Sequence, residues 1–343
     1  MANIGKASSR GGAKVKQRSI GRGGLEVSEV SFGAAQIGNL YREVPDEIAL
    51  DAVAAAWDSE VRYFDTAPHY GLGLSERRMG TVLRREPRQS FVISTKVGRL
   101  IRKNPNFHGQ QDDQGFAVSG EVHRVLDYSR DGVLRSIEES LERLGLDRID
   151  IVFVHDPDDH YREALTGAFP ALEELRSQGV ITSYGAGMNQ AEMLAQFIRN
   201  TDLDVIMLAG RFSLYEQGAL DELLPLALQR SVSVVAAGVF NSGLLAKDRP
   251  TADAHYNYVP APPEVLERVN RIADLCELHG YTLPAVAAQF PLLHPAISSI
   301  CLGARSRDQV ERNAKLFERP VPEQLWKDLA VAGFIRPELV ASS

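Results

Sequence analysis

Strand-like and helix-like stretches alternate along nearly the whole chain, and this alternation limits its possible folds more than any other feature. Apolar stretches with many β-branched residues are separated by patterns with helical spacing. The predicted strands are Glu29–Phe32, Arg62–Phe64, Phe91–Thr95, Asp150–His155, Val180–Ala186, Asp204–Leu208, Ser231–Ala236 and Ile297–Leu302. The predicted helices cover 47–57, 74–85, 130–145, 162–178, 190–199, 219–230, 263–280 and 307–317. Alternating βα units indicate a parallel sheet covered by helices.

Eight such units predict an α/β fold of the (β/α)8 TIM-barrel type. The segment Arg18–Ser28 alternates around a Gly-rich turn, so we expect a β-hairpin that closes the barrel floor. A doubly wound sheet is the alternative. It would need a Gly-rich turn after an early strand, and the stretch Gly71–Gly73 lacks the third glycine of that motif.

The chain is expected to form one barrel domain over residues 18–343, preceded by a flexible basic tail at 1–17. Two long connections, at about 98–129 and 238–262, are expected to overhang the open end of the barrel, where such loops usually serve function. Part of the first could instead be a solvated excursion.

Charge and cysteine content narrow the class of protein. The formal charge of −7 gives no general attraction to nucleic acid or anionic membranes, and a nucleic-acid-binding role for the basic tail is the weaker interpretation. The sequence has no run of 18 apolar residues and no apolar signal-peptide core, so we expect a cytoplasmic protein. Cys276 and Cys301 are too few for a disulfide scaffold and are expected as core residues.

Three of the predicted strands run into an ionisable side chain. The strands end in Asp65, Lys96 and His155, and Tyr70 lies in the loop just after Asp65. If these strands belong to one barrel, all four groups meet at the end where barrel enzymes carry out their chemistry.

These four residue types can move a proton to or from an oxygen atom. A phenol has a pKa of about 10, and a nearby ammonium favours the phenolate, so Lys96 is expected to lower the pKa of Tyr70. Asp65 would keep Lys96 charged, and His155 would orient the substrate oxygen. Because no side chain donates hydride, a nicotinamide cofactor is implied.

A metal-dependent hydrolase is a competing interpretation. The run His155–His160 is rich in histidine and aspartate, and barrel hydrolases bind metals at strand ends. However, no His-x-His pair lies on an early strand, and the aspartates also suit a turn before a helix. We therefore expect no metal.

Three sequence features resemble the aldo-keto reductase superfamily. They are Asp65-Thr66-Ala67-x-x-Tyr70-Gly71-x-Gly73-x-Ser75-Glu76, Ser94-Thr95-Lys96 and His155. The resemblance extends from about Arg18 to about Phe317. It implies a TIM barrel with a floor hairpin, NAD or NADP as cofactor, and a catalytic tetrad at Asp65, Tyr70, Lys96 and His155. The superfamily also includes non-enzymatic subunits that sense cofactor redox state, a second possible function class.

The same resemblance implies a set of cofactor-binding residues. They are Asn189, Phe240, Asn241, Ser242, Gly243, Leu245, Gly303, Arg305, Ser306, Gln309 and Asn313. Met188, Ala209 and Ala237-Gly238 depart from the family pattern around the nicotinamide. The choice between NAD and NADP stays open; Arg305 and Arg307 are the cations available for a 2′-phosphate.

Three further stretches resemble bacterial sugar dehydrogenases of this superfamily that act on L-fucose and D-threo-aldoses, and the related pyridoxal 4-dehydrogenase. They are His155–Asp159, Leu208–Leu214 and Phe240–Gly243. The resemblance implies oxidation of a cyclic hemiacetal to a lactone; reduction of small ketones or aldehydes is the alternative. Aromatic and histidine side chains of the first long loop could line the substrate pocket: Phe107, His108, Phe116, His123 and Tyr128. The oligomeric state is left open.

Overall fold

Eight parallel strands close into a barrel, which confirms the predicted fold class. Around the barrel the order is β10-β11-β14-β3-β4-β5-β8-β9. The strands are β3 (Val30–Gly33), β4 (Tyr63–Asp65), β5 (Val92–Val97), β8 (Ile151–His155), β9 (Ser183–Met188), β10 (Val205–Ala209), β11 (Ser233–Ala237) and β14 (Ile297–Gly303). This computed structural model describes residues 16–257 and 259–341. Residues 1–15 of the predicted tail lie outside this part, and Gln17 already belongs to a strand.

The fifth barrel strand begins at Ser183, three residues later than predicted. The preceding helix ends in a left-handed turn, with Gly179 at φ 71°. The amide of Val180 donates to the carbonyl of Leu175 at 2.9 Å, so this residue still caps the helix. Val180, an apolar residue of the predicted strand, therefore lies at the end of a helix and not in the sheet.

The barrel interior is filled by side chains from alternate positions of each strand. Tyr63, Val92, Ile151 and Phe153 belong to one buried cluster that also contains Val205, Met207, Val235 and Cys301. Because side chains of a strand alternate between its two faces, residues two or four positions further along the same strands also point inward. This alternation directs Asp65, Lys96 and His155 into the barrel at its carboxyl end.

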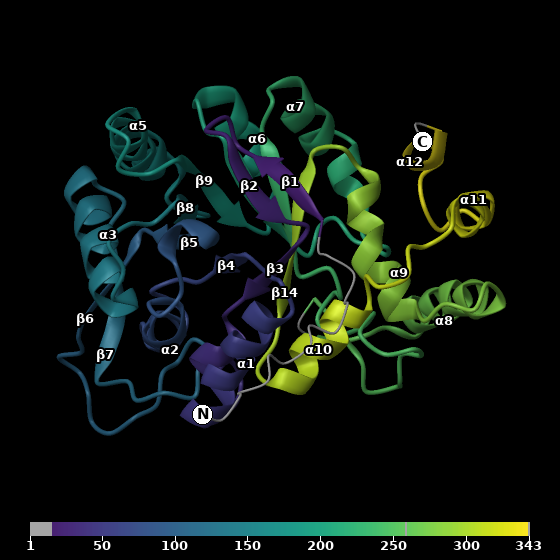
Figure 1. Ribbon diagram of the computed structural model, residues 1–343, viewed down its shortest axis with the longest axis horizontal. Helices are drawn as coiled ribbons and strands as arrows, with labels where there is room; N and C mark the ends of the chain where they lie inside the picture. The colour runs from purple at the N-terminus through teal and green to yellow at the C-terminus, as the bar shows by residue number, and fades with distance from the viewer. Residues whose placement is uncertain (1–15, 258, 342–343) are drawn as a thin grey trace, which may run out of the picture.

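The predicted floor hairpin is present as β1 (Gln17–Ile20) and β2 (Leu25–Ser28), paired antiparallel. Its Ile20 and Val27 belong to the interior cluster, so the hairpin plugs the barrel. Arg22 in its turn is hydrogen-bonded to Asp204 and Asp202 at the amino end of β10. The hairpin lies at the upper end of the molecule in Figure 1.

Helices cover the outside of the barrel. They are α1 (Asp46–Asp58), α2 (Leu74–Leu83), α3 (Arg130–Leu144), α4 (Tyr161–Glu163), α5 (Phe169–Ser177), α6 (Ala191–Asn200), α7 (Leu223–Gln229), α8 (Pro263–Leu278), α9 (Leu283–Gln289), α10 (Arg307–Lys315), α11 (Glu323–Val331) and α12 (Glu338–Ala341). The sequence prediction missed α9, α11 and α12. It also treated 162–178 as one helix, where a π-helical segment separates α4 from α5. Cys276 lies in α8 and Cys301 in β14, both buried and unpaired, as expected.

The first long connection is not a solvated excursion, because it contains a second β-hairpin. Strands β6 (Arg99–Lys103) and β7 (Val122–Leu126) pair antiparallel beside α3, at the lower left of Figure 1. The segment between them folds back onto the loop after β3. There the amide of Tyr41 donates to Gly115 and the amide of Ala117 donates to Asn39. The second long connection carries the short strands β12 (His255–Tyr256) and β13 (Val259–Pro260).

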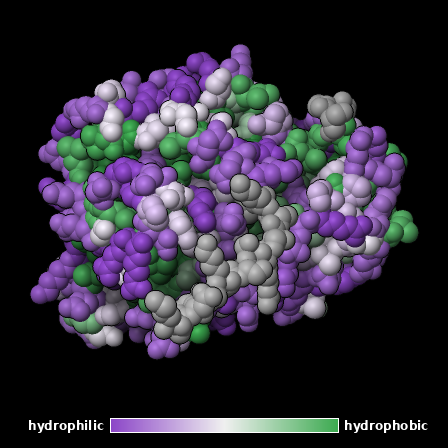
Figure 2. Space-filling view, in the orientation of Figure 1, coloured by the Kyte–Doolittle hydropathy of each residue, from purple (hydrophilic) through white to green (hydrophobic). Residues whose placement is uncertain are grey.

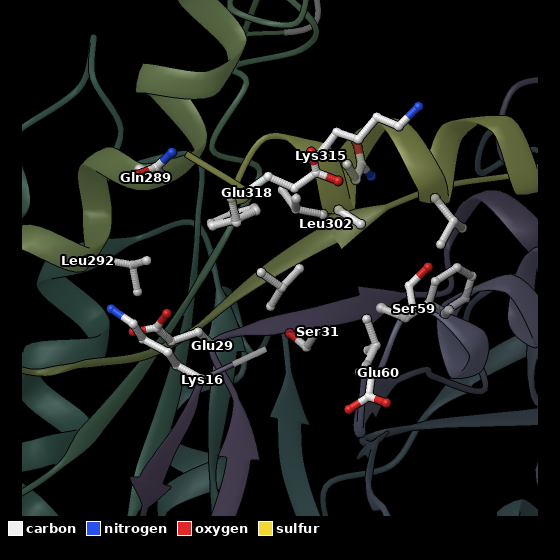
Figure 3. A pocket seen from close by; sticks show the side chains of 18 of the residues that line it. Lys16, Glu29, Ser31, Ser59, Glu60, Gln289, Leu292, Leu302, Lys315 and Glu318 are labelled. Atoms are coloured by element: carbon white, nitrogen blue, oxygen red, sulfur yellow. The ribbon is translucent and has the colours of Figure 1, made fainter. Parts of the chain in front are cut away.

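The face shown in Figure 2 is mainly hydrophilic, with dispersed hydrophobic groups. Within the described ranges, no helix combines the length and the apolar character needed to cross a membrane. A cavity of about 950 Å³ lies on the outer side of β3 and β14, lined by residues such as Ser31, Leu302 and Lys315 (Figure 3). None of the four tetrad residues lines it, so the chemistry suggested by the sequence lies elsewhere.

Candidate active site

The four predicted catalytic residues meet at the carboxyl end of the barrel. Asp65 ends β4, Lys96 lies one residue before the end of β5, and His155 ends β8. Tyr70 comes from the loop after β4. Neighbouring strands β4, β5 and β8 are paired in register, which brings their ends together.

Asp65 and Lys96 form a buried ion pair. The Lys96 Nζ to Asp65 Oδ2 distance is 2.6 Å, and only 2% and 3% of the respective side chains are exposed. Lys96 also donates to the carbonyl of Thr66 at 2.9 Å, and Asp65 Oδ1 accepts from Ser94 at 2.7 Å. Burial alone would lower the pKa of Lys96, but Asp65 and Tyr70 outweigh burial and hold that pKa above its ordinary value. Lys96 is therefore a fixed positive charge.

The Tyr70 ring lies against this charge, with Lys96 Nζ 4.7 Å from its centroid. Burial raises the pKa of Tyr70 to about 12, while Lys96 acts in the opposite direction. The expectation that Lys96 lowers the pKa of Tyr70 overall was therefore wrong, although the sign of the ammonium's effect was right. At neutral pH the phenol carries its proton and can donate it.

His155 faces Tyr70 from the end of β8. The two ring centroids are 5.7 Å apart and the rings are perpendicular, at 89°. Burial lowers the pKa of His155 well below its ordinary value, and Lys96 and Arg99 add to this effect. The imidazole is therefore neutral at physiological pH, with one N–H donor and one acceptor nitrogen. Its Nδ1 is buried without a partner among the described residues.

The positions of Gly71 and Glu76 beside Tyr70 have a structural explanation. Gly71 has φ 62°, and a Cβ there would lie 2.2 Å from the carbonyl oxygen of Gly38, so only glycine fits. Glu76 is fully buried and accepts hydrogen bonds from Thr95 and Arg143. These contacts fix the Tyr70 loop to the strand that carries Lys96.

Of the aromatic and histidine residues expected to line the pocket, Phe116 reaches the tetrad. Its ring lies 6.2 Å from Tyr70 and 5.1 Å from His69. Tyr128 instead donates a hydrogen bond to the backbone carbonyl of His155 at 3.0 Å and so helps to hold the end of that strand in place. His108 is exposed. The sequence reading of this loop missed Arg99 and Arg124, which reach the site from the hairpin β6–β7. No local signal indicated them, because the two strands show no regular apolar alternation.

The residues expected around the nicotinamide lie on neighbouring strand ends. Asn189 follows β9 and donates to the carbonyl of Ala209 at 3.1 Å. The side chain of Asn241 turns inward, accepting from Ser213 at 2.5 Å and donating to Gly210 at 3.2 Å. Asn241 therefore holds the loop that contains Phe240, Ser242, Gly243 and Leu245. Its side-chain amide is already hydrogen-bonded to Ser213 and Gly210.

Gln309 and Asn313, both on α10, also form hydrogen bonds within the protein, to the turn that precedes the helix. Gln309 accepts from the amide of Arg305 at 2.9 Å, and Asn313 donates to the carbonyl of Gly303 at 3.3 Å. Ser306 is the N-cap residue of α10, as predicted. These contacts shape the turn between β14 and α10.

The two candidate cations at this turn differ in their surroundings. Arg307 is engaged by Asp51 at 2.7 Å and Asp58 at 3.3 Å, so it is not free for a phosphate. Arg305 Nε is buried without a partner among the described residues. Burial lowers the pKa of Arg305, and the nearby Arg42 lowers it further. Arg305 thus fits an anionic group of a nicotinamide dinucleotide.

The histidines of the run proposed for metal binding have different partners. His160 lies 5.3 Å from the ring of Tyr128 and 3.6 Å from Glu163, whereas His155 faces Tyr70. Across the residues that the structure describes, no group of three or more His, Cys, Asp or Glu side chains is arranged to hold a metal ion.

The chain is similar to known proteins along most of its length. The aldo/keto reductase family profile matches residues 29–332. The chain is 45% identical over 315 residues to a D-threo-aldose 1-dehydrogenase from a Pseudomonas species, covering 91% of this chain and 96% of the relative. It is 41% identical over 343 residues to a pyridoxal 4-dehydrogenase from Microbacterium luteolum, covering 93% and 98%.

A solved structure of a glycerol dehydrogenase from Gluconobacter oxydans superimposes with a TM-score of 0.75 at 24% identity, covering 94% of this chain and 98% of the other, and supports the fold. The protein is accordingly an NAD(P)-dependent oxidoreductase that interconverts a carbonyl and an alcohol. By the extent of the match and by its barrel, the chain belongs to the aldo/keto reductase family.

Proposed function

We propose that Tyr70 is the general acid and base of this oxidoreductase. The supporting observation is the buried Lys96–Asp65 pair beside the Tyr70 ring, with neutral His155 on the other side. In reduction, Tyr70 gives its proton to the carbonyl oxygen. In oxidation, the phenolate takes the proton of the alcohol.

In this proposal Lys96 and Asp65 act through Tyr70. The ammonium stabilises the phenolate that forms when the proton leaves, and Asp65 keeps the ammonium charged and in place. His155 donates a hydrogen bond to the same substrate oxygen and fixes its position between two donors. Since the pKa of His155 lies well below its ordinary range, it performs this role without changing charge near neutral pH.

The nicotinamide cofactor supplies or accepts the hydride when it is bound, since no side chain can. Arg305 would hold an anionic group of the cofactor at the amino end of α10, a position suited to anions. Asn189 would face the nicotinamide from the end of β9. Asn241 would act indirectly by fixing the loop 240–245, whose backbone would help to hold the cofactor.

We further propose that the substrate is a sugar in its cyclic hemiacetal form, oxidised to a lactone. The support is the 45% identity to a D-threo-aldose 1-dehydrogenase over 91% of the chain. The anomeric hydroxyl gives its proton to Tyr70, the anomeric C–H gives its hydride to the oxidised cofactor, and the C–O bond becomes the lactone carbonyl. Pyridoxal, which also forms a cyclic hemiacetal, is the second candidate, favoured by the 41% identical relative and by the aromatic wall of His69 and Phe116.

The decisive experiment compares wild type with Tyr70→Phe. A panel of aldoses, pyridoxal and simple aldehydes is tested with NAD⁺, NADP⁺ and their reduced forms by absorbance of the reduced nicotinamide. Loss of the acid/base should lower kcat by about 10²- to 10⁴-fold. Cofactor binding, followed by quenching of protein fluorescence, should stay close to wild type. A variant that keeps most of its kcat would refute the role of Tyr70.

A cytoplasmic location belongs to this proposal as well. It is supported by the two cysteines, Cys276 and Cys301, which are both buried as free thiols in different elements. We likewise propose that the protein acts on a small-molecule substrate and binds neither nucleic acid nor a membrane. Fractionation of the native host would test the location.

A further inference from the structure

A second group of charged side chains surrounds the tetrad and comes mostly from the hairpin β6–β7. Arg99 begins β6 and Arg124 lies on β7 opposite Ile101, so alternation places both arginines on one face of the hairpin. Arg102, on the opposite face, pairs with Glu139 of α3 at 2.8 Å. One face of the hairpin therefore binds the barrel helices, while the other presents two guanidinium groups to the Tyr70 loop.

Arg99 links the face of the hairpin that carries the two arginines to the tetrad. Its Nη2 lies 3.0 Å from Asp156 Oδ2, and the same carboxylate oxygen lies 3.5 Å from His155 Nε2. Its Nη1 is 3.5 Å from His69 Nδ1. The His69 ring in turn lies 5.4 Å from His155 and 6.0 Å from Tyr70. A substrate whose oxygen lies between Tyr70 and His155 would thus have Arg99 and Asp156 beside its neighbouring atoms.

The position of Asp156 is fixed by its backbone. Its φ is 39°, a left-handed conformation that aspartate and asparagine tolerate better than most residues. Its amide donates to Gly187 at 3.1 Å, and its carbonyl accepts from Tyr128 at 3.2 Å. The carboxylate therefore has a defined place at the end of β8, with 30% of its side chain exposed.

The charges in this group are balanced. Lys96 faces Asp65, Arg99 faces Asp156, and Arg124 binds Asp112 through both terminal nitrogens. The two histidines are neutral, since burial lowers the pKa of His155 well below its ordinary value and that of His69 to about 2. An anionic substrate group would find no unpaired cation among these residues and would lie close to Asp156. A neutral substrate rich in hydroxyl groups would instead find hydrogen-bond donors on Arg99 and an acceptor on Asp156.

Hydrogen-bonding capacity remains in the Arg99–Asp156 pair. Arg99 Nε is buried and has no partner within the described part of the chain. The hydrogen bond that Asp156 accepts from Arg99 uses Oδ2, so Oδ1 can accept from another group. A hydroxyl on the carbon next to the reacting one can donate to such a carboxylate and accept from such a guanidinium.

We propose that Arg99 and Asp156 form a hydroxyl-binding subsite that selects neutral substrates bearing a hydroxyl group next to the reacting carbon. This inference rests on the proposed aldose oxidation and extends it, because it names the residues that read the sugar. In this role the two residues bind substrate and take no part in proton transfer.

The test compares an aldose with its 2-deoxy counterpart in wild type, Asp156→Asn and Arg99→Lys. Asparagine suits the left-handed backbone, and lysine keeps the charge but loses the planar fork. Glu139→Gln is the matched control, because it weakens the ion pair on the other face of the same hairpin. The readout is the ratio of kcat/KM for the aldose to kcat/KM for the deoxy sugar, with Tm measured for every variant.

Wild type should prefer the aldose by about 10- to 100-fold, since a site built around a substrate hydroxyl rejects the analogue that lacks it. Both subsite variants should reduce this preference to less than about threefold, and Glu139→Gln should keep it. If wild type does not discriminate, or if both variants slow the two sugars equally, the inference is refuted and the pair only fastens the hairpin. If no aldose is oxidised while a simple aldehyde is reduced, the proposed substrate fails together with this inference.

Discussion

Replacing Lys96 by methionine removes the charge beside Tyr70 while keeping most of the side-chain volume. With Nζ 4.7 Å from the ring centroid, Coulomb's law at an effective dielectric constant of about 20 gives roughly 3.5 kcal/mol of phenolate stabilisation. At about 1.36 kcal/mol per tenfold change, the variant should hold a few hundred times less phenolate at a given pH. Aldose oxidation near pH 8 should slow by a similar factor, measured as kcat from nicotinamide absorbance under saturating cofactor.

The decisive control is the double variant Lys96→Met/Tyr70→Phe. If Lys96 acts through the phenol, adding Lys96→Met to Tyr70→Phe should lower kcat by less than about threefold, because residues that act as a unit are not additive. Losses that multiply in the double variant would refute the reasoning. The variant leaves Asp65 buried and unpaired, which should destabilise the protein by about 3–5 kcal/mol. Circular dichroism at the assay temperature must therefore show that it is folded.

Two further outcomes follow from the titration and charge of the site. Burial raises the pKa of Tyr70 to about 12, so the rate of oxidation by the phenolate should rise about tenfold per pH unit between pH 6 and 9. The rate of reduction by the phenol should stay level over the same range. A fall of the reduction rate below about pH 6.5 would instead point to a titrating histidine. Arg305→Ala should raise KM for NADPH by about 10- to 100-fold and KM for NADH much less, since it removes a charged partner of the 2′-phosphate. Arg307→Ala, whose guanidinium is already paired with Asp51, is the control, and equal effects of the two variants would contradict this assignment.

The tetrad was predictable because strand geometry fixes where strand ends go. Once β4, β5 and β8 were recognised as parallel strands, the ionisable residues at their ends had to meet at the same end of the barrel. The alternation of side chains along each strand then settled that Asp65, Lys96 and His155 point inward. This inference needed only apolar runs and a two-residue period, both of which a single sequence contains.

The hairpin β6–β7 could not be predicted in the same way. Its strands have five residues each and mix polar and apolar side chains, with Arg99, Arg102 and Lys103 in one and His123 and Arg124 in the other. These sequences show no regular apolar alternation, and the hairpin is held by ion pairs with Glu139 and Asp156 as well as by the buried Leu100. Each of these pairs joins residues at least 37 positions apart in the chain, so no local pattern indicates it.

The pKa of Tyr70 could not be predicted from the types of the neighbouring residues alone. The presence of Lys96 near the phenol correctly predicts that the ammonium favours the phenolate. Whether the pKa ends above or below its ordinary value depends on a competition between that charge and the loss of water around the ring, and burial prevails here. Phe116 and the segment that carries it contribute to this burial, because its ring packs 6.2 Å from Tyr70. The loop that was hardest to predict from the sequence therefore helps to set the acidity of the residue that was easiest to predict.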